Sequence, residues 1–253
     1  DGVSSPEIGK RVTCALNQPI AKSGAPVYFE ALGSERDGAF AQYCCVSADQ
    51  LFDVSESPLT DIEIGAMPCA YGTALNLLTR SQVNDGDRVL VTGASGGVGL
   101  ATVQLARQKG ARVTAIASAP KADAVLAAGA QSVLDRDASL PKEGFTVVID
   151  VVGGNQFGEF LDALCPGGRL ATSGAIAGPM AEVDLRTLYL KDLTVFGCTY
   201  QSREVFRALV SLINTGSIRP LVSKVYPLKE IAQAQTDFMA KRYPGKLVLR
   251  PFF

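Results

Sequence analysis

One stretch of the sequence limits the fold more than any other: an apolar run, a glycine-rich turn and a helical pattern follow one another directly. Arg88 to Thr92 reads as a buried strand, and Ala94-Ser95-Gly96-Gly97-Val98-Gly99 follows at once. Apolar residues then recur at helical spacing up to Gly110. Glycine at these offsets allows a tight turn, a close backbone approach and close packing of helix on strand. The segment therefore predicts a strand, a turn and a helix whose first N–H groups bind phosphate.

The alternation of strands and helices continues to about residue 216. The strands expected after the turn are Val113 to Ala117, Val133-Leu134, Phe145 to Val152, Arg169 to Ser173 and Leu193 to Cys198, with helices between them over Lys121 to Ala128, Asn155 to Leu164 and Arg203 to Asn214. Strands that alternate with helices predict a parallel sheet with right-handed crossovers. We therefore expect an α/β, doubly wound (Rossmann) domain.

The two ends of the chain have a different character. The first 60 or so residues are rich in Gly, Pro and Ser, with short strand-like pieces such as Phe40 to Val46. Strands at Val222 to Tyr226 and Lys246 to Arg250, with a helix over Glu230 to Lys241, close the chain. We expect both ends to belong to one smaller, β-rich domain.

Composition narrows the classes of function. The net charge is −1 over 253 residues, which gives no electrostatic basis for a nucleic-acid or anionic-membrane partner. No apolar run reaches the roughly 20 residues of a membrane span, and no signal-peptide pattern is visible. Six cysteines without paired C-x-x-C spacing are typical of a reduced, cytoplasmic protein. With no histidine, the chain lacks the commonest general base and metal ligand.

The residues after the second strand favour one dinucleotide over the other. NAD sites usually carry an acid about 20 residues beyond the turn, where this chain has Ala117-Ser118 and then Lys121. A hydroxyl and a cation suit a 2′-phosphate, and one charge-assisted hydrogen bond is worth about 1.5–3 kcal/mol, roughly 10- to 100-fold in affinity. The sequence thus predicts NADP(H), with Ser118 and Lys121 at the phosphate. The alternatives are a helix cap for Ser118 and a solvated lysine for Lys121.

Two dehydrogenase families carry a turn of this kind. Thr92 to Gly99 also fits T-G-x-x-x-G-x-G, which resembles the short-chain dehydrogenases, but those place the turn near the start of the chain and use a Tyr-x-x-x-Lys pair. None of the seven tyrosines has lysine four residues later. Gly38 to Tyr43, Pro68 to Leu75, Asp87 to Gly99, Pro166 to Leu170 and Gly245 to Leu249 together resemble the medium-chain dehydrogenase/reductase family, in its quinone-oxidoreductase-like and alcohol-dehydrogenase-like branch.

The resemblance implies a bilobal oxidoreductase that transfers hydride between NADPH and a carbonyl, quinone or activated alkene. Its β-rich domain would be GroES-like and partly missing, because the family's first segment would lie upstream of Asp1. The implied domains are 1–75, 76–221 and 222–253, the first and last forming the catalytic domain. Members of this kind often form homodimers through the edge strand, here Leu193–Cys198.

The resemblance also suggests where cofactor and substrate would bind. The nicotinamide would lie near Thr73, Val151, Val152, Gly153, Ser173 and Gly174. Tyr71 is a candidate proton donor, with a packed helix aromatic as the alternative. Cys69 stands where zinc-dependent members place a ligand, although a small buried hydrophobe is the favoured reading. A zinc-dependent alcohol dehydrogenase and a non-catalytic NADPH-binding protein remain as alternative functions.

Overall fold

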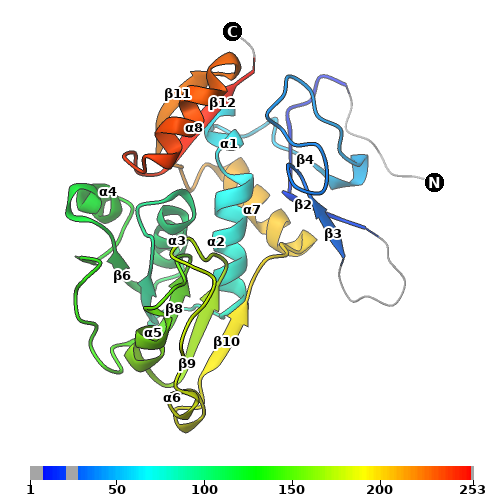
Figure 1. The fold of residues 1–253 in the computed structure, drawn as a ribbon. Coiled ribbons are helices and arrows are strands. Elements are labelled where there is room, and N and C mark those ends of the chain that lie inside the picture. The colour runs from blue at the N-terminus through cyan, green and yellow to red at the C-terminus, as the bar shows by residue number, and fades with distance from the viewer. Residues whose placement is uncertain (1–7, 21–27, 252–253) are drawn as a thin grey trace. The chain divides into compact units, whose positions relative to one another are not determined.

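A computed structural model describes residues 8–20 and 28–251 of the chain (Figure 1). Its internal contacts divide the chain into two units. Unit 2 is Thr73–Thr199, and unit 1 contains the residues on either side of it. The helix α2, Pro68–Arg80, begins in unit 1 and ends in unit 2. Each unit is described separately below.

Unit 2 is built on one six-stranded parallel sheet. In chain order the strands are β5 (Arg88–Val91), β6 (Arg112–Ile116), β7 (Ser132–Leu134), β8 (Phe145–Asp150), β9 (Leu164–Thr172) and β10 (Thr194–Gly197). Their spatial order is β10-β9-β8-β5-β6-β7, and every neighbouring pair is parallel. This is the order of a doubly wound dinucleotide-binding sheet, and it reverses direction between β5 and β8. The expected Rossmann architecture is confirmed, and the ligand crevice of such a sheet lies at the carboxyl ends of β5 and β8.

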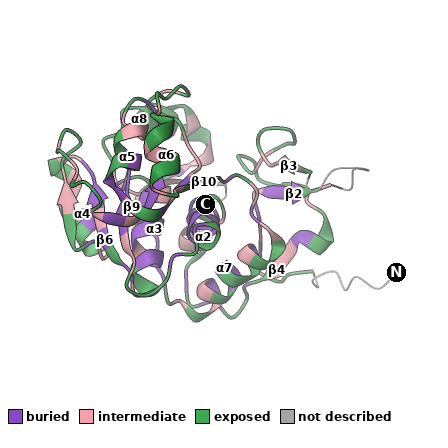
Figure 2. Ribbon diagram, turned by 90° about the horizontal axis from the view of Figure 1, so that it is seen from below, coloured by how far each residue is buried: buried purple, intermediate pink, exposed green. Residues whose placement is uncertain are grey.

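Helices follow most of the strands of this unit. They are α3 (Gly97–Gln108), the short η2 (Ala119–Lys121), α4 (Ala122–Ala127), α5 (Phe157–Ala163) and α6 (Leu185–Leu190). Helix α6 was not expected from the sequence; its first turn is capped by the Asp184 side chain, which accepts from the Arg186 N–H. Buried residues, purple in Figure 2, run along α3 and β9.

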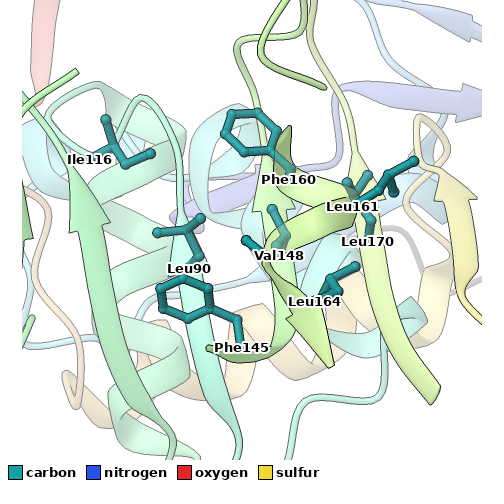
Figure 3. Packing of buried hydrophobic residues seen from close by; sticks show 9 residues of the cluster. Leu90, Ile116, Phe145, Val148, Phe160, Leu161, Leu164 and Leu170 are labelled. Carbon is teal, nitrogen blue, oxygen red and sulfur yellow. The ribbon is translucent and has the colours of Figure 1, made fainter. Parts of the chain in front are cut away.

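The core of unit 2 has a clear chemical basis. Strand β8 is rich in β-branched and aromatic residues and is buried on both faces, as expected for a central parallel strand. Figure 3 shows side chains from β5, β6, β8, β9 and α5 brought together, among them Leu90, Phe145 and Phe160, all at most 5% exposed. The core therefore fixes the strand ends from which the site residues project.

The described part of unit 1 contains three two-stranded sheets. β1 (Val12–Cys14) pairs antiparallel with β4 (Leu51–Asp53), β2 (Asn17–Pro19) antiparallel with β3 (Phe29–Ala31), and β11 (Val222–Pro227) parallel with β12 (Lys246–Arg250). Its helices are α1 (Asp61–Gly65), α7 (Arg203–Thr215) and α8 (Ile231–Met239), with single turns η1 (Ala48–Gln50) and η3 (Leu228–Glu230). Both ends of the chain thus contribute to one unit that contains several short strands.

Two expectations differ from this structure. Residues 40–46 form no strand, and both Phe40 and Tyr43 are strongly exposed. The expected strand was wrong because none of the strands within residues 8–20 and 28–251 pairs with this segment, so its backbone groups join no ladder there. Helix α7 was grouped with the coenzyme domain, but its contacts place it in unit 1. There the Phe206 ring packs 5.2 Å from that of Phe52, and the Ser57 hydroxyl donates to the Ile213 carbonyl.

Candidate coenzyme site

The glycine-rich turn joins β5 to α3 at the carboxyl edge of the sheet. Gly96 is the N-cap of α3, and because glycine has no side chain, nothing caps the helix from that position. The first N–H groups of the helix, at Gly97 and Val98, have no carbonyl partner within the helix itself. They therefore remain able to bind an anion at the positive end of the helix dipole.

Not every amide of the turn is available for a ligand. The N–H of Ala94 donates to the Ile116 carbonyl at 3.2 Å, and the N–H of Gly96 donates to the Gly93 carbonyl at 3.0 Å. The first bond ties the turn to the end of β6, and the second closes the turn on itself. The N–H groups left for a phosphate are therefore those at the start of α3, and the predicted cofactor-binding role of Ala94 to Gly99 stays a prediction.

The glycines of the turn differ in what surrounds them. A Cβ added at Gly99 would lie 2.2 Å from the Gly93 oxygen and 2.5 Å from the Ala94 Cα, so the helix packs directly on the turn. Gly93 has a φ of +55°, a conformation that favours glycine. A Cβ at Gly96 would meet only the Gly93 oxygen at 3.4 Å, an ordinary contact, and Gly96 is exposed. Protein packing explains Gly99, whereas the open space at Gly96 is available to a ligand.

The remaining turn residues have the burial expected of a tight connection. Ala94 is fully buried and Ser95 is 7% exposed, while Gly97 and Val98 are half-buried. Small side chains at Ala94 and Ser95 let the turn pass beneath the helix. The surface left to a ligand is the exposed side of Gly96 and the first turn of α3.

Ser118 and Lys121 lie just beyond the carboxyl end of β6. Ser118 is half-buried and precedes η2, but its side chain makes no capping bond. The Lys121 N–H donates to the Ser118 carbonyl at 2.9 Å, which draws the two residues into one turn. No acid stands between them, and Asp123 is the first acid after β6. The cap alternative for the Ser118 hydroxyl therefore gains no support, and its prediction as a phosphate contact stays open.

The segment after β8 brings further predicted residues to the same edge. Gly153 has a φ of +65° and Gly154 a φ of +75°, so the chain turns sharply after Val152. A Cβ added at Gly93 would lie 3.0 Å from a methyl carbon of Val152, so this segment contacts the glycine-rich turn. The predicted nicotinamide segment and the predicted phosphate turn are thus neighbours within unit 2.

Ser173 and Gly174 close the other side of this segment. The Ser173 N–H donates to the backbone carbonyl of Asp150 at 3.1 Å. A Cβ at Gly174 would lie 2.8 Å from the Val151 oxygen, so only glycine allows so close an approach. The segments Val151–Gly153 and Ser173–Gly174 therefore contact each other beyond the ends of β8 and β9.

Asp150 is a site residue that the sequence alone did not reveal. It is the last residue of β8 and is fully buried, and its carboxylate accepts a hydrogen bond from the Thr92 hydroxyl at 2.7 Å. It also accepts from the N–H groups of Val152 and Gly153, at 3.0 Å and 3.1 Å. The signal that could have revealed it is a charged residue at the end of an otherwise apolar central strand, since a buried charge needs partners.

The candidate catalytic and metal residues lie around the start of α2. Tyr71 is 1% exposed, and its hydroxyl donates to the Arg219 carbonyl at 3.1 Å within unit 1. Thr73 is half-buried and is the first residue of unit 2. Their proposed roles stay predictions. Cys69 is exposed, which corrects the reading of it as a small buried hydrophobe.

The described residues do not assemble a metal site. Within residues 8–20 and 28–251, no group of three or more His, Cys, Asp or Glu side chains could hold a metal ion. Cys69 thus has no set of fellow ligands in the part of the chain that the structure describes. No helix in that part is long and apolar enough to cross a membrane.

Comparison with known proteins agrees with this geometry. The chain is 32% identical to an acryloyl-coenzyme A reductase of Metallosphaera sedula, over 98% of this chain and 78% of that protein. The chain belongs to the medium-chain dehydrogenase/reductase family. A family model described as "Zinc-binding dehydrogenase" matches residues 97–215. A quinone oxidoreductase of Sus scrofa is 31% identical over 85% of this chain and 70% of that protein.

Solved structures of family members share the fold. A putative alcohol dehydrogenase from Sinorhizobium meliloti has a TM-score of 0.90 and 43% identity, covering all of this chain and 72% of the other. A 2-octenoyl-CoA carboxylase reductase, solved with NADP and 2-octenoyl-CoA, has a TM-score of 0.81 and 28% identity, covering 87% and 57%. The predicted fold class and family are confirmed.

Proposed function

We propose that this family member is an NADPH-dependent oxidoreductase. The observation that carries the proposal is the uncapped start of α3 beside exposed Gly96, at the point where the sheet order reverses, with Ser118 rather than an acid after β6. The N–H groups of Gly97 and Val98 would hold the pyrophosphate. Ser118 and Lys121 would hold the 2′-phosphate, where an acid would repel it.

The segments beyond β8 and β9 would receive the nicotinamide. Val151, Val152 and Gly153 offer apolar side chains and a sharp turn, and Ser173 and Gly174 lie against them. Bound NADPH would supply a hydride to an electron-poor carbon of the substrate. The role of these residues would be to hold the ring in one orientation and to exclude water from one of its faces.

Among carbonyls, quinones and activated alkenes, we propose an enoyl thioester as the first substrate to test. Support comes from the relatives, since an acryloyl-coenzyme A reductase and a structure with bound 2-octenoyl-CoA both concern this class. The experiment is NADPH oxidation by the complete protein with enoyl-CoA thioesters, enals, quinones and aldehydes, repeated with NADH. Turnover with NADPH on an activated alkene supports the proposal, and a clear preference for NADH contradicts it.

Two other outcomes of this experiment identify the alternatives. Alcohol oxidation that stops on chelation and returns with zinc would identify a zinc-dependent alcohol dehydrogenase, with Cys69 as a candidate ligand. Tight NADPH binding without turnover of any substrate would identify a non-catalytic binding protein. Tyr71→Phe and Thr73→Val then test the two candidate catalytic side chains without changing their volumes greatly.

We also propose that the chain forms homodimers through β10 and its flanks, Leu193–Cys198. β10 is the last strand of the sheet, so one of its backbone edges has no strand beside it among the described strands. Val195 in β10 is 41% exposed, and Leu190 just before it is 72% exposed. Pairing of this edge with a second copy would cover these groups.

A further inference from the structure

We propose that Asp150 is a positioning residue that fixes the nicotinamide-binding segment to the glycine-rich turn. The inference rests on the proposed function and adds to it the residue that would set the orientation of the ring. The side chain of Asp150 is not itself expected to contact the coenzyme, because it is fully buried.

The Asp150 carboxylate joins three chain segments at the point where the sheet order reverses. Its Oδ1 accepts from the Thr92 hydroxyl at 2.7 Å, which connects the end of β8 to the residue that follows β5. Its Oδ2 is 3.4 Å from the hydroxyl of Thr172, the last residue of β9. The carboxylate therefore connects the ends of three adjacent strands through side chains alone.

The same carboxylate shapes the segment that follows it. Oδ1 accepts from the Val152 N–H at 3.0 Å, and both oxygens accept from the Gly153 N–H, at 3.2 Å and 3.1 Å. The Thr92 hydroxyl, which donates to Asp150, accepts in turn from the Val151 N–H at 3.0 Å. Three successive backbone N–H groups of the predicted nicotinamide segment are thus held by Asp150 and Thr92.

The donors around Asp150 match a carboxylate and not an amide. Two hydroxyls and two backbone N–H groups converge on oxygens that only accept. None of the ion pairs within residues 8–20 and 28–251 includes Asp150, so hydrogen bonds take the place of a cation. An asparagine of the same shape would turn one donor toward another donor and release part of the segment.

The test compares Asp150→Asn with Asp87→Asn in the complete protein. Asp87 is the matched control, because it lies at the amino end of β5 and also accepts several hydrogen bonds, from Thr146, Arg169 and the Asn84 N–H. Each variant is titrated with NADPH and with adenosine 2′,5′-bisphosphate, which carries the phosphates of the adenosine half but no nicotinamide. Melting temperatures are measured alongside.

We expect Asp150→Asn to bind NADPH about tenfold or more weakly while keeping its affinity for the bisphosphate. With a substrate found for the parent protein, kcat should fall about 10- to 100-fold, because a small misplacement of the ring slows hydride transfer. Asp87→Asn should lower the melting temperature and leave both affinities unchanged. Should Asp150→Asn fail to fold, Thr92→Val tests the same connection, and Thr92→Ser, which keeps the hydroxyl, should restore NADPH binding.

The possible results separate this proposal from the proposed function. Equal losses for NADPH and the bisphosphate in Asp150→Asn, or parental affinity and kcat, would overturn the positioning role and leave the function intact. If Asp150→Asn does not fold and Thr92→Val binds NADPH and the bisphosphate with parental affinity, the positioning role is likewise overturned. If the parent protein binds neither ligand, both proposals fail together.

Discussion

Replacing Gly96 by alanine should test whether the open space at this position serves ligand binding and not the packing of the protein. Gly96 has φ −81° and ψ 174°, which alanine adopts without strain, and the added Cβ would meet only the Gly93 oxygen at 3.4 Å. Alanine is a poorer N-cap than glycine, so we expect the free energy of unfolding to fall by at most about 1 kcal/mol. The exposed methyl group would stand where a pyrophosphate must approach the first turn of α3. The loss of one charge-assisted hydrogen bond would raise the Kd for NADPH about 10- to 100-fold.

Gly99→Ala is the contrasting variant. Its Cβ would lie 2.2 Å from the Gly93 oxygen and 2.5 Å from the Ala94 Cα, and neither backbone atom can swing aside. We expect a loss of roughly 2–3 kcal/mol in the free energy of unfolding, the upper part of the range for overpacked sites. Urea unfolding without coenzyme and a fluorescence titration with NADPH measure the two quantities. The reasoning is that Gly96 leaves room for a ligand and that Gly99 lets the helix pack on the turn. Parental NADPH affinity in Gly96→Ala, or a larger stability loss in that variant than in Gly99→Ala, would refute it.

Five further outcomes can be measured, at four positions of the chain. Ser118→Asp places a carboxylate at the predicted 2′-phosphate, so the preference for NADPH over NADH should fall about 10- to 100-fold in parallel titrations; an unchanged preference contradicts the phosphate contact. Asp87→Ala removes the carboxylate 2.8 Å from the Arg169 guanidinium and should lower the free energy of unfolding by roughly 2–3 kcal/mol in urea, whereas a neutral result would mean that the pair adds nothing. Burial raises the pKa of the Cys14 thiol from 9.0 to about 11, so at pH 8 it should react with iodoacetamide more slowly than the exposed cysteines. The folded state holds this proton more tightly than the unfolded state. The protonated thiol therefore adds to the free energy of unfolding below pH 9, and this contribution is lost between about pH 9 and 11. In Cys14→Ala, the free energy of unfolding should fall less over this pH range than in the parent protein. Val195→Lys puts a charge on the predicted dimer edge and should give a monomer in sedimentation, while a dimer of parental strength would place the interface elsewhere.

The sequence predicted most helices and strands of unit 2, and helix α7 of unit 1, because their signals are local. A run such as Phe145–Asp150 is apolar on both faces, as expected of a central strand, and Gly96 to Gly99 follow a strand and precede a helical pattern, which marks the start of the helix. Helix α7 was placed almost to the residue, since Ser202 caps it and Gly216 ends it with φ +62°. Signals of this kind depend on residues close together in the chain.

Prediction failed where structure depends on distant partners. Phe40 to Val46 has the composition of a strand, but a strand forms only if another pairs with it, and none of the described strands does. α7 has the period and caps of a helix in an α/β domain, yet its apolar face packs against Phe52 of unit 1. The residues of these two segments, 40–46 and α7, do not themselves indicate which strand or surface each segment will pack against.

Asp150 shows the same limit at the level of a single side chain. Within its strand it is one polar residue after Val148 and Ile149, which reads as the point where the strand meets solvent. In the structure it is fully buried, because Thr92 lies across the adjacent strand end, 58 residues away in sequence, with a hydroxyl 2.7 Å from its carboxylate. The parallel register brings these two residues together. Val91 of β5 pairs with Ile149 of β8, and the residues that follow them in the chain are Thr92 and Asp150. Once the strand order and register are known, Thr92 and Asp150 are expected to lie side by side at the ends of adjacent strands. Each residue alone is a weak indication of a site, whereas the pair is a strong one.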